Sequence, residues 1–292
     1  MKRLLGVCLA LTVSAWSFSQ NDQIQNKKGQ DLMPVAGEIG VGVNAIPVFN
    51  YIGDIFGLSS NNTSLDTNKF IGYFGSQTLF GKYMLTDDNA IRVNLRVGQQ
   101  NTTTTVDVVN DLAGHPDSLT SDVFRGRQSD INIGVGYEFR RGKNRLRGIY
   151  GGELLWSRSK QKGNYTYGNA FGVTNPAPST TDFSLLSATP QTNRIRSFDN
   201  GTIQGLGVRL FGGIEYYFAP KICVGTEFGW TVGGAWQGRS TITTEFWSPL
   251  ALDPATGSTG AVDFTESNSF TQSSFSMDTD NFNGAVYFLF WF

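Results

Sequence analysis

The chain has 292 residues, with 23 basic and 24 acidic side chains, 35 glycines and an aromatic content of 13%. This balance of charge argues against nucleic acid as a partner, because chains that bind nucleic acid carry a clear basic excess. High glycine and aromatic contents without a long apolar block are typical of a chain built from strands.

The N-terminus has the layout of a secretory signal. Lys2 and Arg3 are followed by an apolar run up to Trp16 and then by small residues. That run is too short for a helix that spans a bilayer, so we expect residues 1–19 to be a cleaved signal peptide. Cleavage would leave 21 basic and 24 acidic residues and a single cysteine, Cys223, which cannot form an internal disulfide.

The first part of the expected mature chain is polar. Residues 20–34 show no periodicity, which predicts a flexible lead. Apolar side chains at every second position then predict a strand over 35–46. Residues 47–68 break the alternation as a loop would, and residues 70–85, which alternate less regularly, are interpreted as a second strand.

The clearest strand of the sequence comes next. Residues 91–98 alternate strictly between aliphatic and polar side chains, a period that has no helical interpretation. A polar stretch over 103–127 is interpreted as a long loop. Strands are predicted over 130–139 and 146–157, joined by the short turn 140–145.

The second half repeats this rhythm. A long loop is expected over 161–200, strands over 206–218 and 222–232, and another long loop over 241–276. Parts of that last loop, 240–246 and 269–276, alternate enough to extend the strands beyond it.

The last fourteen residues, Thr279 to Phe292, form the eighth predicted strand. One face would carry the apolar and glycine positions Phe282, Gly284, Val286, Phe288, Phe290 and Phe292. This ending resembles the closing strand of bacterial outer-membrane β-barrel proteins, which finish on an aromatic segment with a terminal Phe. The alternation of long and short connections over nearly the whole mature chain is similar to that of the small eight-stranded barrels of the OmpA, OmpX and OmpW type.

The resemblance implies an all-β fold: an eight-stranded antiparallel up-and-down transmembrane β-barrel over residues 35–292. It also implies a monomer in the outer membrane of a Gram-negative bacterium, surrounded by outer-membrane lipid. In that family the last strand is an address for the barrel-insertion machinery, and here Phe288, Phe290 and Phe292 match it.

If the apolar parity faces lipid, the charged parity faces the lumen. The expected lumen charges are Glu38, Lys82, Arg92, Arg96, Asp130, Glu138, Arg147, Glu153, Arg209, Glu215 and Glu227. A barrel of eight strands is just wide enough for side chains to fill, so these charges must pair. We expect Glu138 and Arg147 to lie close together across their turn. The alternative is a narrow selective path, but its lining would show a bias toward one sign.

Residues for chemistry are few. His115, with Ser118, Ser121 and Asp117 nearby, is the one candidate for a lipid-modifying enzyme of barrel type, but no motif around it supports catalysis. Candidate metal ligands such as Asp107 and Asp111 are scattered. We therefore predict that the protein is not an enzyme and carries no cofactor or metal.

The favoured function is a structural or surface-interaction role, with a mostly closed lumen and a possible protein or glycan partner at the outer loops. The alternatives are an OmpW-like conduit for small hydrophobic molecules, for which Phe211 and Tyr217 are weak apolar candidates in the lumen, and an accessory barrel of a secretion or gliding apparatus.

Overall fold

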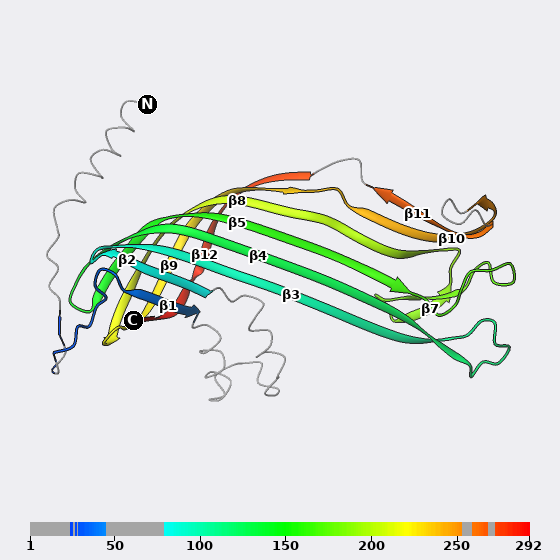
Figure 1. The fold of residues 1–292 in the computed structure, drawn as a ribbon, viewed down its shortest axis with the longest axis horizontal. Helices are drawn as coiled ribbons and strands as arrows, with labels where there is room; N and C mark the ends of the chain where they lie inside the picture. Colours follow the sequence, from blue (N-terminus) through cyan, green and yellow to red (C-terminus); the bar gives the residue numbers. More distant parts are fainter. Residues whose placement is uncertain (1–23, 26, 28, 45–78, 253–258, 268–271) are drawn as a thin grey trace, which may run out of the picture.

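The protein is an all-β molecule built from antiparallel strands (Figure 1). The computed structural model describes residues 24–25, 27, 29–44, 79–252, 259–267 and 272–292. Within these ranges the chain forms no helix, and so none that is long and apolar enough to cross a membrane. The predicted signal peptide and the predicted loop 47–68 lie outside the described residues.

Eight strands pair around a closed ring. They are, in chain order, β1 (Ile39–Asn44), β2 (Leu79–Thr86), β3 (Asn89–Val109), β4 (Leu119–Lys143), β5 (Leu146–Thr166), β8 (Asn193–Ala219), β9 (Ile222–Gln237) and β12 (Gln272–Trp291). Each pairs with its neighbour in this order, and β12 returns to β1. All eight predicted strands are therefore present, the second only from Leu79, since residues 70–78 lie outside the described part.

The last strand closes the ring against the first. The register runs from Gly40 opposite Trp291 to Asn44 opposite Tyr287. The backbone N–H of Phe292 donates to the oxygen of Ile39 at 2.9 Å, and the N–H of Ile39 donates back at 3.1 Å. These bonds extend the pairing of the two strands to the last residue of the chain.

The two faces of the ring wall are the reverse of those in a protein that folds around an apolar core. On β3, Arg92 is 3% exposed whereas the adjacent Val93 is 43% exposed. Because side chains alternate across a strand, every ring strand sends one parity inward and the other outward. The outward set is aliphatic and aromatic; on the long strands it includes Ile91, Leu95, Ile133, Val135, Tyr137, Leu154, Val208, Leu210 and Trp230.

The strands β3, β4, β5 and β8 run far past the ends of β1 and β2 (Figure 1). The prediction of a loop over 103–127 is therefore wrong: β3 and β4 stay paired without interruption as far as Val109 opposite Leu119. Residues 102–105 are all threonine, a β-branched type that suits a strand without producing an alternation of apolar and polar side chains.

Beyond the ring these strands form an outer sheet together with β10 (Thr241–Leu252) and β11 (Thr259–Ser267). After the pairing of β9 with β8 ends at Gln237, β10 takes over the same edge from Thr241. The predicted strand extensions are confirmed for 241–246 and 272–276. The predicted loop 161–200 contains the hairpin of β6 (Ser179–Asp182) and β7 (Ser187–Pro190), and β8 already begins at Asn193.

The segment before β1 packs against the ring. Leu32 and Met33 are buried, and the N–H of Lys221 in the β8–β9 turn donates to the oxygen of Leu32 at 3.0 Å. The Nε of Arg147 contacts the Sδ of Met33 at 2.9 Å. Part of the predicted flexible lead is thus held against the end of the ring that carries the short turns.

Candidate functional site: a charged cluster and a cavity inside the ring

Eight charged side chains meet inside the ring near its short turns. The cations are Lys82, Arg92, Arg140 and Arg209, and the carboxylates are Glu138, Glu153, Glu215 and Glu227; all of them are buried. They come from β2, β3, β4, β5, β8 and β9, so the cluster joins six of the eight ring strands.

Glu215 is the most heavily bonded member. Its oxygens accept hydrogen bonds from Lys82 Nζ at 2.7 Å and from Arg140 Nη2 at 2.6 Å. The hydroxyls of Tyr287 and Tyr217 donate to the same carboxylate at 2.9 and 3.2 Å. A carboxylate with four donors is fully compensated for its loss of water.

Arg92 links the two halves of the cluster. Its guanidinium donates two bonds to Glu227, at 3.0 and 3.1 Å, and contacts Glu138 at 3.4 Å and Glu153. Its central carbon lies 4.2 Å from the ring centre of Phe211, which places the cation over an aromatic face.

The cluster continues through Arg209 and closes through Glu138. Arg209 Nη1 lies 3.3 Å from Glu153 and 3.0 Å from Glu227. Glu138 accepts from Lys82 at 2.6 Å and from Arg140 at 2.9 Å. Four positive and four negative groups balance, which matters because an uncompensated buried charge costs several kcal/mol.

The structure brings most of the predicted lumen charges into this cluster, namely Lys82, Arg92, Glu138, Glu153, Arg209, Glu215 and Glu227. Arg140 was missed, because the prediction assigned it to the turn 140–145. The alternation of side chains could have identified it, because Arg140 lies two residues after Glu138 and therefore faces the same side of the strand.

The other predicted charges lie elsewhere. Glu38 pairs with Lys221 at the end with the short turns. Asp130 accepts from Ser159 Oγ at 2.6 Å, further toward the outer sheet, and Arg96 is partly buried on the inner parity of β3.

The predicted contact between Glu138 and Arg147 is wrong. In the register of β4 and β5, Glu138 faces Gly151, whereas Arg147 faces Gly142 and donates to its oxygen at 2.9 Å. The two strands stay paired almost to the tip of their turn, so the residues do not meet across it.

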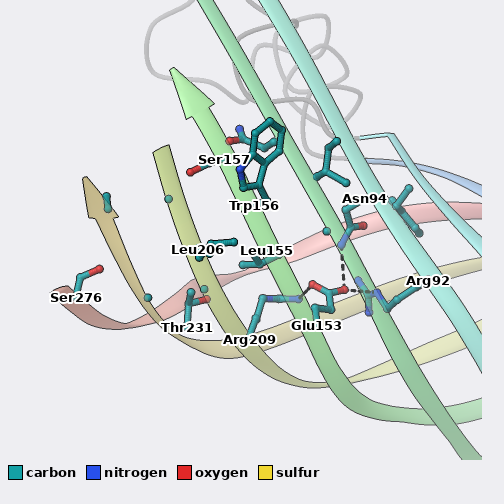
Figure 2. Close-up of a pocket in the computed structure, with 18 of the residues that line it drawn as sticks. Arg92, Asn94, Glu153, Leu155, Trp156, Ser157, Leu206, Arg209, Thr231 and Ser276 are labelled. Carbon is teal, nitrogen blue, oxygen red and sulfur yellow. Dashed lines mark hydrogen bonds and ion pairs between the residues drawn. The ribbon is translucent and has the colours of Figure 1, made fainter. Parts of the chain in front are cut away.

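A cavity of about 510 Å³ lies next to the cluster inside the ring (Figure 2). Arg92, Glu153 and Arg209 form its charged side, and Asn94 Nδ2 donates to Glu153 at 2.9 Å. The space exists because several inward positions carry no side chain; these are Gly134, Gly205, Gly207 and Gly233. Polar groups of Asn132, Ser157 and Thr231 also line it.

On the opposite side of the cluster the interior is packed. Buried apolar side chains fill it: Met33, Met84, Ala90, Ile149, Tyr217, Cys223, Leu289 and Trp291, while Tyr287 of the same core also lines the cavity. Phe211 and Tyr217, predicted as weak candidates for an apolar lumen, are both buried, but each contacts a guanidinium of the cluster. The cavity is therefore bounded at one end by ion pairs and, behind them, by this packed layer.

The predicted catalytic candidate is not assembled into a triad-like arrangement. His115 lies in the β3–β4 loop, and its side chain is mostly exposed with its Nδ1 3.6 Å from Asp117. Ser121 donates instead to Asp107 at 2.6 Å. Among the described residues, no group of three or more His, Cys, Asp or Glu side chains is placed to hold a metal ion.

A second buried polar centre, which the sequence did not reveal, lies in the outer sheet. The guanidinium of Arg194 is sandwiched between the rings of Tyr167 and Phe171, at 4.4 and 4.6 Å, and it pairs with Glu245 at 2.9 Å. Burial of its hydroxyl raises the pKa of Tyr167.

Asp122 anchors the β6–β7 hairpin to the same region. Its carboxylate accepts the N–H groups of Gly168 and Thr181 at 2.9 and 2.8 Å. These contacts join residues far apart in the sequence, which explains why no local pattern predicted them.

The chain has no match among family models, curated proteins or solved structures. Its function is therefore inferred from the ring, the charged cluster and the outer sheet.

Proposed function

We propose that the protein is an eight-stranded β-barrel of a bacterial outer membrane, closed inside, that holds its outer sheet beyond the membrane as a surface for a partner. The observation that carries the proposal is the reversal of the two faces: charges are buried inside the ring, and aliphatic and aromatic side chains cover the outside. Such an outer surface is unfavourable in water and favourable in hydrocarbon.

The outward apolar side chains of the ring strands form a belt around the ring, and the height of this apolar belt supports the same proposal. On β5 the outward positions from Leu146 to Trp156 hold apolar residues or glycine, and the next outward position is the basic Arg158. This stretch spans about 33 Å along the strand. With a strand tilt of about 40°, its height is roughly 25 Å, the height of the apolar band of outer-membrane barrels.

The charged cluster supports a closed interior. Its members pair across the ring, and the packed apolar layer lies behind them, so ions would have to displace both. The ring thus serves as an anchor. Under this proposal Phe290 on the outer face of β12 and Phe292 just after it, both exposed, contact lipid and form part of the signal for the insertion machinery.

The outer sheet has the features of a binding surface. The contacts of Arg194 and Asp122 order its loops, while the loop tips expose Leu112, Val173 and Leu185. Exposed apolar side chains among polar ones suit a protein partner or a glycan. Purification from native membranes, with the ring intact, would recover such a partner.

Site-directed spin labelling tests the membrane orientation. Val93 and Thr103 both point outward on β3, the first within the apolar belt and the second in the outer sheet. A label at Val93→Cys in reconstituted bilayers should be accessible to oxygen, and one at Thr103→Cys to a water-soluble nickel complex. Cys223 is buried and should stay unlabelled. If both labels meet the nickel complex equally, the protein does not span the bilayer.

A second function, a conduit for small hydrophobic molecules, is favoured by the cavity, whose lining includes Phe80, Leu155 and Val286. It requires an exit that bypasses the charged cluster. Single-channel recordings and uptake of a small apolar dye separate the two functions: the closed anchor should show neither steady conductance nor uptake.

A further inference from the structure

Five cations gather on the outward face of β4 and β5. They are Arg125 and Arg127 on β4, and Arg158, Lys160 and Lys162 on β5. All lie on the parity that carries the apolar belt, since the ladder between the two strands is uninterrupted from Val123 to Lys143. They therefore form one patch on the outer surface of the sheet.

The patch begins where the apolar belt ends. Ile133 pairs with Trp156, the next outward pair is Ile131 with Arg158, and the pair after that is Ser129 with Lys160. Each step along the ladder is about 7 Å. Along the strands, Arg158 thus lies about 7 Å and Lys160 about 13 Å beyond the last apolar pair, where the head groups of the surrounding lipid would begin. Arg127, Lys162 and Arg125 follow at about 20 to 27 Å, so the patch extends outward from the head groups.

The patch holds more cations than the neighbouring strands balance with carboxylates. Arg127 faces Lys162 directly across the ladder, and like charges in directly opposed positions destabilise a sheet. In the described part of the chain, Asp199 is the carboxylate that contacts the patch: it lies 2.9 Å from Lys160 and is paired with Lys162 across the β5–β8 ladder, so one carboxylate stands against five cations. Arg127 instead donates to the amide oxygen of Gln99 at 3.4 Å.

We propose that this basic patch binds the phosphate groups of a phosphorylated lipid in the membrane that surrounds the ring. An anion between Arg127 and Lys162 would relieve their repulsion, and a guanidinium offers the paired donors that a phosphate accepts. The acyl chains would lie along Ile133 and Trp156, about 20 Å below that pair along the strands, with Arg158 and Lys160 in between for the phosphates nearest the chains. The apolar side chains followed by cations along the strands match the acyl chains and the phosphates of one lipid, whereas a soluble polyanion would contact only the cations. The proposal rests on the membrane orientation proposed above.

The test compares two lipids that differ only in the phosphate. The full-length protein in detergent is titrated with dioleoyl phosphatidic acid or with dioleoylglycerol, and binding is followed by native mass spectrometry. We expect selective binding of the phosphorylated lipid. The triple variant Arg127→Gln, Arg158→Gln, Lys162→Gln should lose about fivefold in affinity per cation, roughly a hundredfold in all.

The control removes as many cations at the other end of the strands, with Arg141→Gln and Lys143→Gln at the end of β4 and Arg145→Gln in the β4–β5 turn, and should bind as the parent does. Equal binding of both lipids, or equal loss in the two triple variants, would overturn the proposal. So would binding of inorganic phosphate alone as tightly as the lipid, since the patch would then be a site for free anions. The spin label at Val93 in the same samples separates the two proposals. If the label lies in lipid but the protein does not prefer the phosphorylated lipid, the lipid-binding proposal is wrong and the proposed membrane orientation still holds.

Discussion

The replacement Glu215→Gln tests whether the charged cluster stabilises the ring. Glu215 is fully buried and accepts from Lys82, Arg140 and two tyrosine hydroxyls. The glutamine keeps the volume but removes one negative charge, so four cations would face three carboxylates. The glutamine side-chain NH₂ would also face Lys82 and Arg140, which are themselves hydrogen-bond donors. Breaking a buried pair in this way costs about 3–5 kcal/mol.

The free energy of unfolding would be measured by urea titration of the protein folded in detergent, with the outward-lying Glu266→Gln as control. Glu266 is exposed on β11, so its loss should change stability by less than about 0.5 kcal/mol. The double replacement Lys82→Met with Glu215→Gln restores the balance of charge. It should be destabilised by clearly less than the sum of the single replacements, with a coupling of about 1–3 kcal/mol.

The reasoning is refuted if Glu215→Gln behaves like the exposed control, or if the double replacement is simply additive. Either result would mean that water in the interior already screens the cluster, and that the ring is held by its hydrogen-bond ladder and apolar packing alone.

Two further predictions concern the strand ladder and the outer sheet. Gly151→Ala should lower the free energy of unfolding in urea by about 3 kcal/mol, because a Cβ there would lie 2.0 Å from a backbone oxygen of β4. Gly172→Ala, which has open space around it, is the control. Equal effects of the two replacements would contradict the close approach of β4 and β5 at Gly151. Partial burial raises the pKa of Asp111, but hydrogen bonds from Asn175 and from the N–H of Ser179 outweigh it and hold that pKa below the ordinary 3.8. Because the folded pKa is depressed, the stabilisation is complete above about pH 4 and is lost as the pH falls through the folded value. Hydrogen exchange of the Ser179 amide should rise only at that acidity, and Asp111→Asn should abolish the dependence.

The ring could be predicted from the sequence because its wall has two different environments. Because one face of the wall carries exposed apolar side chains and the other faces a charged interior, the side chains alternate, and the pattern over 91–98 and 130–139 shows it directly. The same reasoning located most members of the charged cluster, since parity alone decides which charges point inward.

The outer sheet was not predictable in the same way. Residues 102–109 and 119–127 are paired strands, yet polar side chains occur on both of their faces, so no alternation of apolar and polar residues marks them. The centre around Arg194 is built from residues of the β5–β8 connection and from Glu245 on β10. Such contacts depend on which strands become neighbours, and that is settled only when the ring closes.

The register of β4 and β5 is fixed from both faces at once. A shift of one residue would turn Glu138 to the outer face and Arg127 toward the interior, because the side-chain period of a strand is two. The charged cluster opposes that shift at one end of the ladder, the apolar belt along the middle and, under the lipid proposal, the basic patch at the other. Since the pairing is continuous from Val123 to Lys143, the ladder that places Glu138 inside the ring also sets the orientation of the outer sheet. Under the proposed function, a partner bound to that sheet would thus be held at a defined angle to the ring, with no hinge in these two strands to relax it.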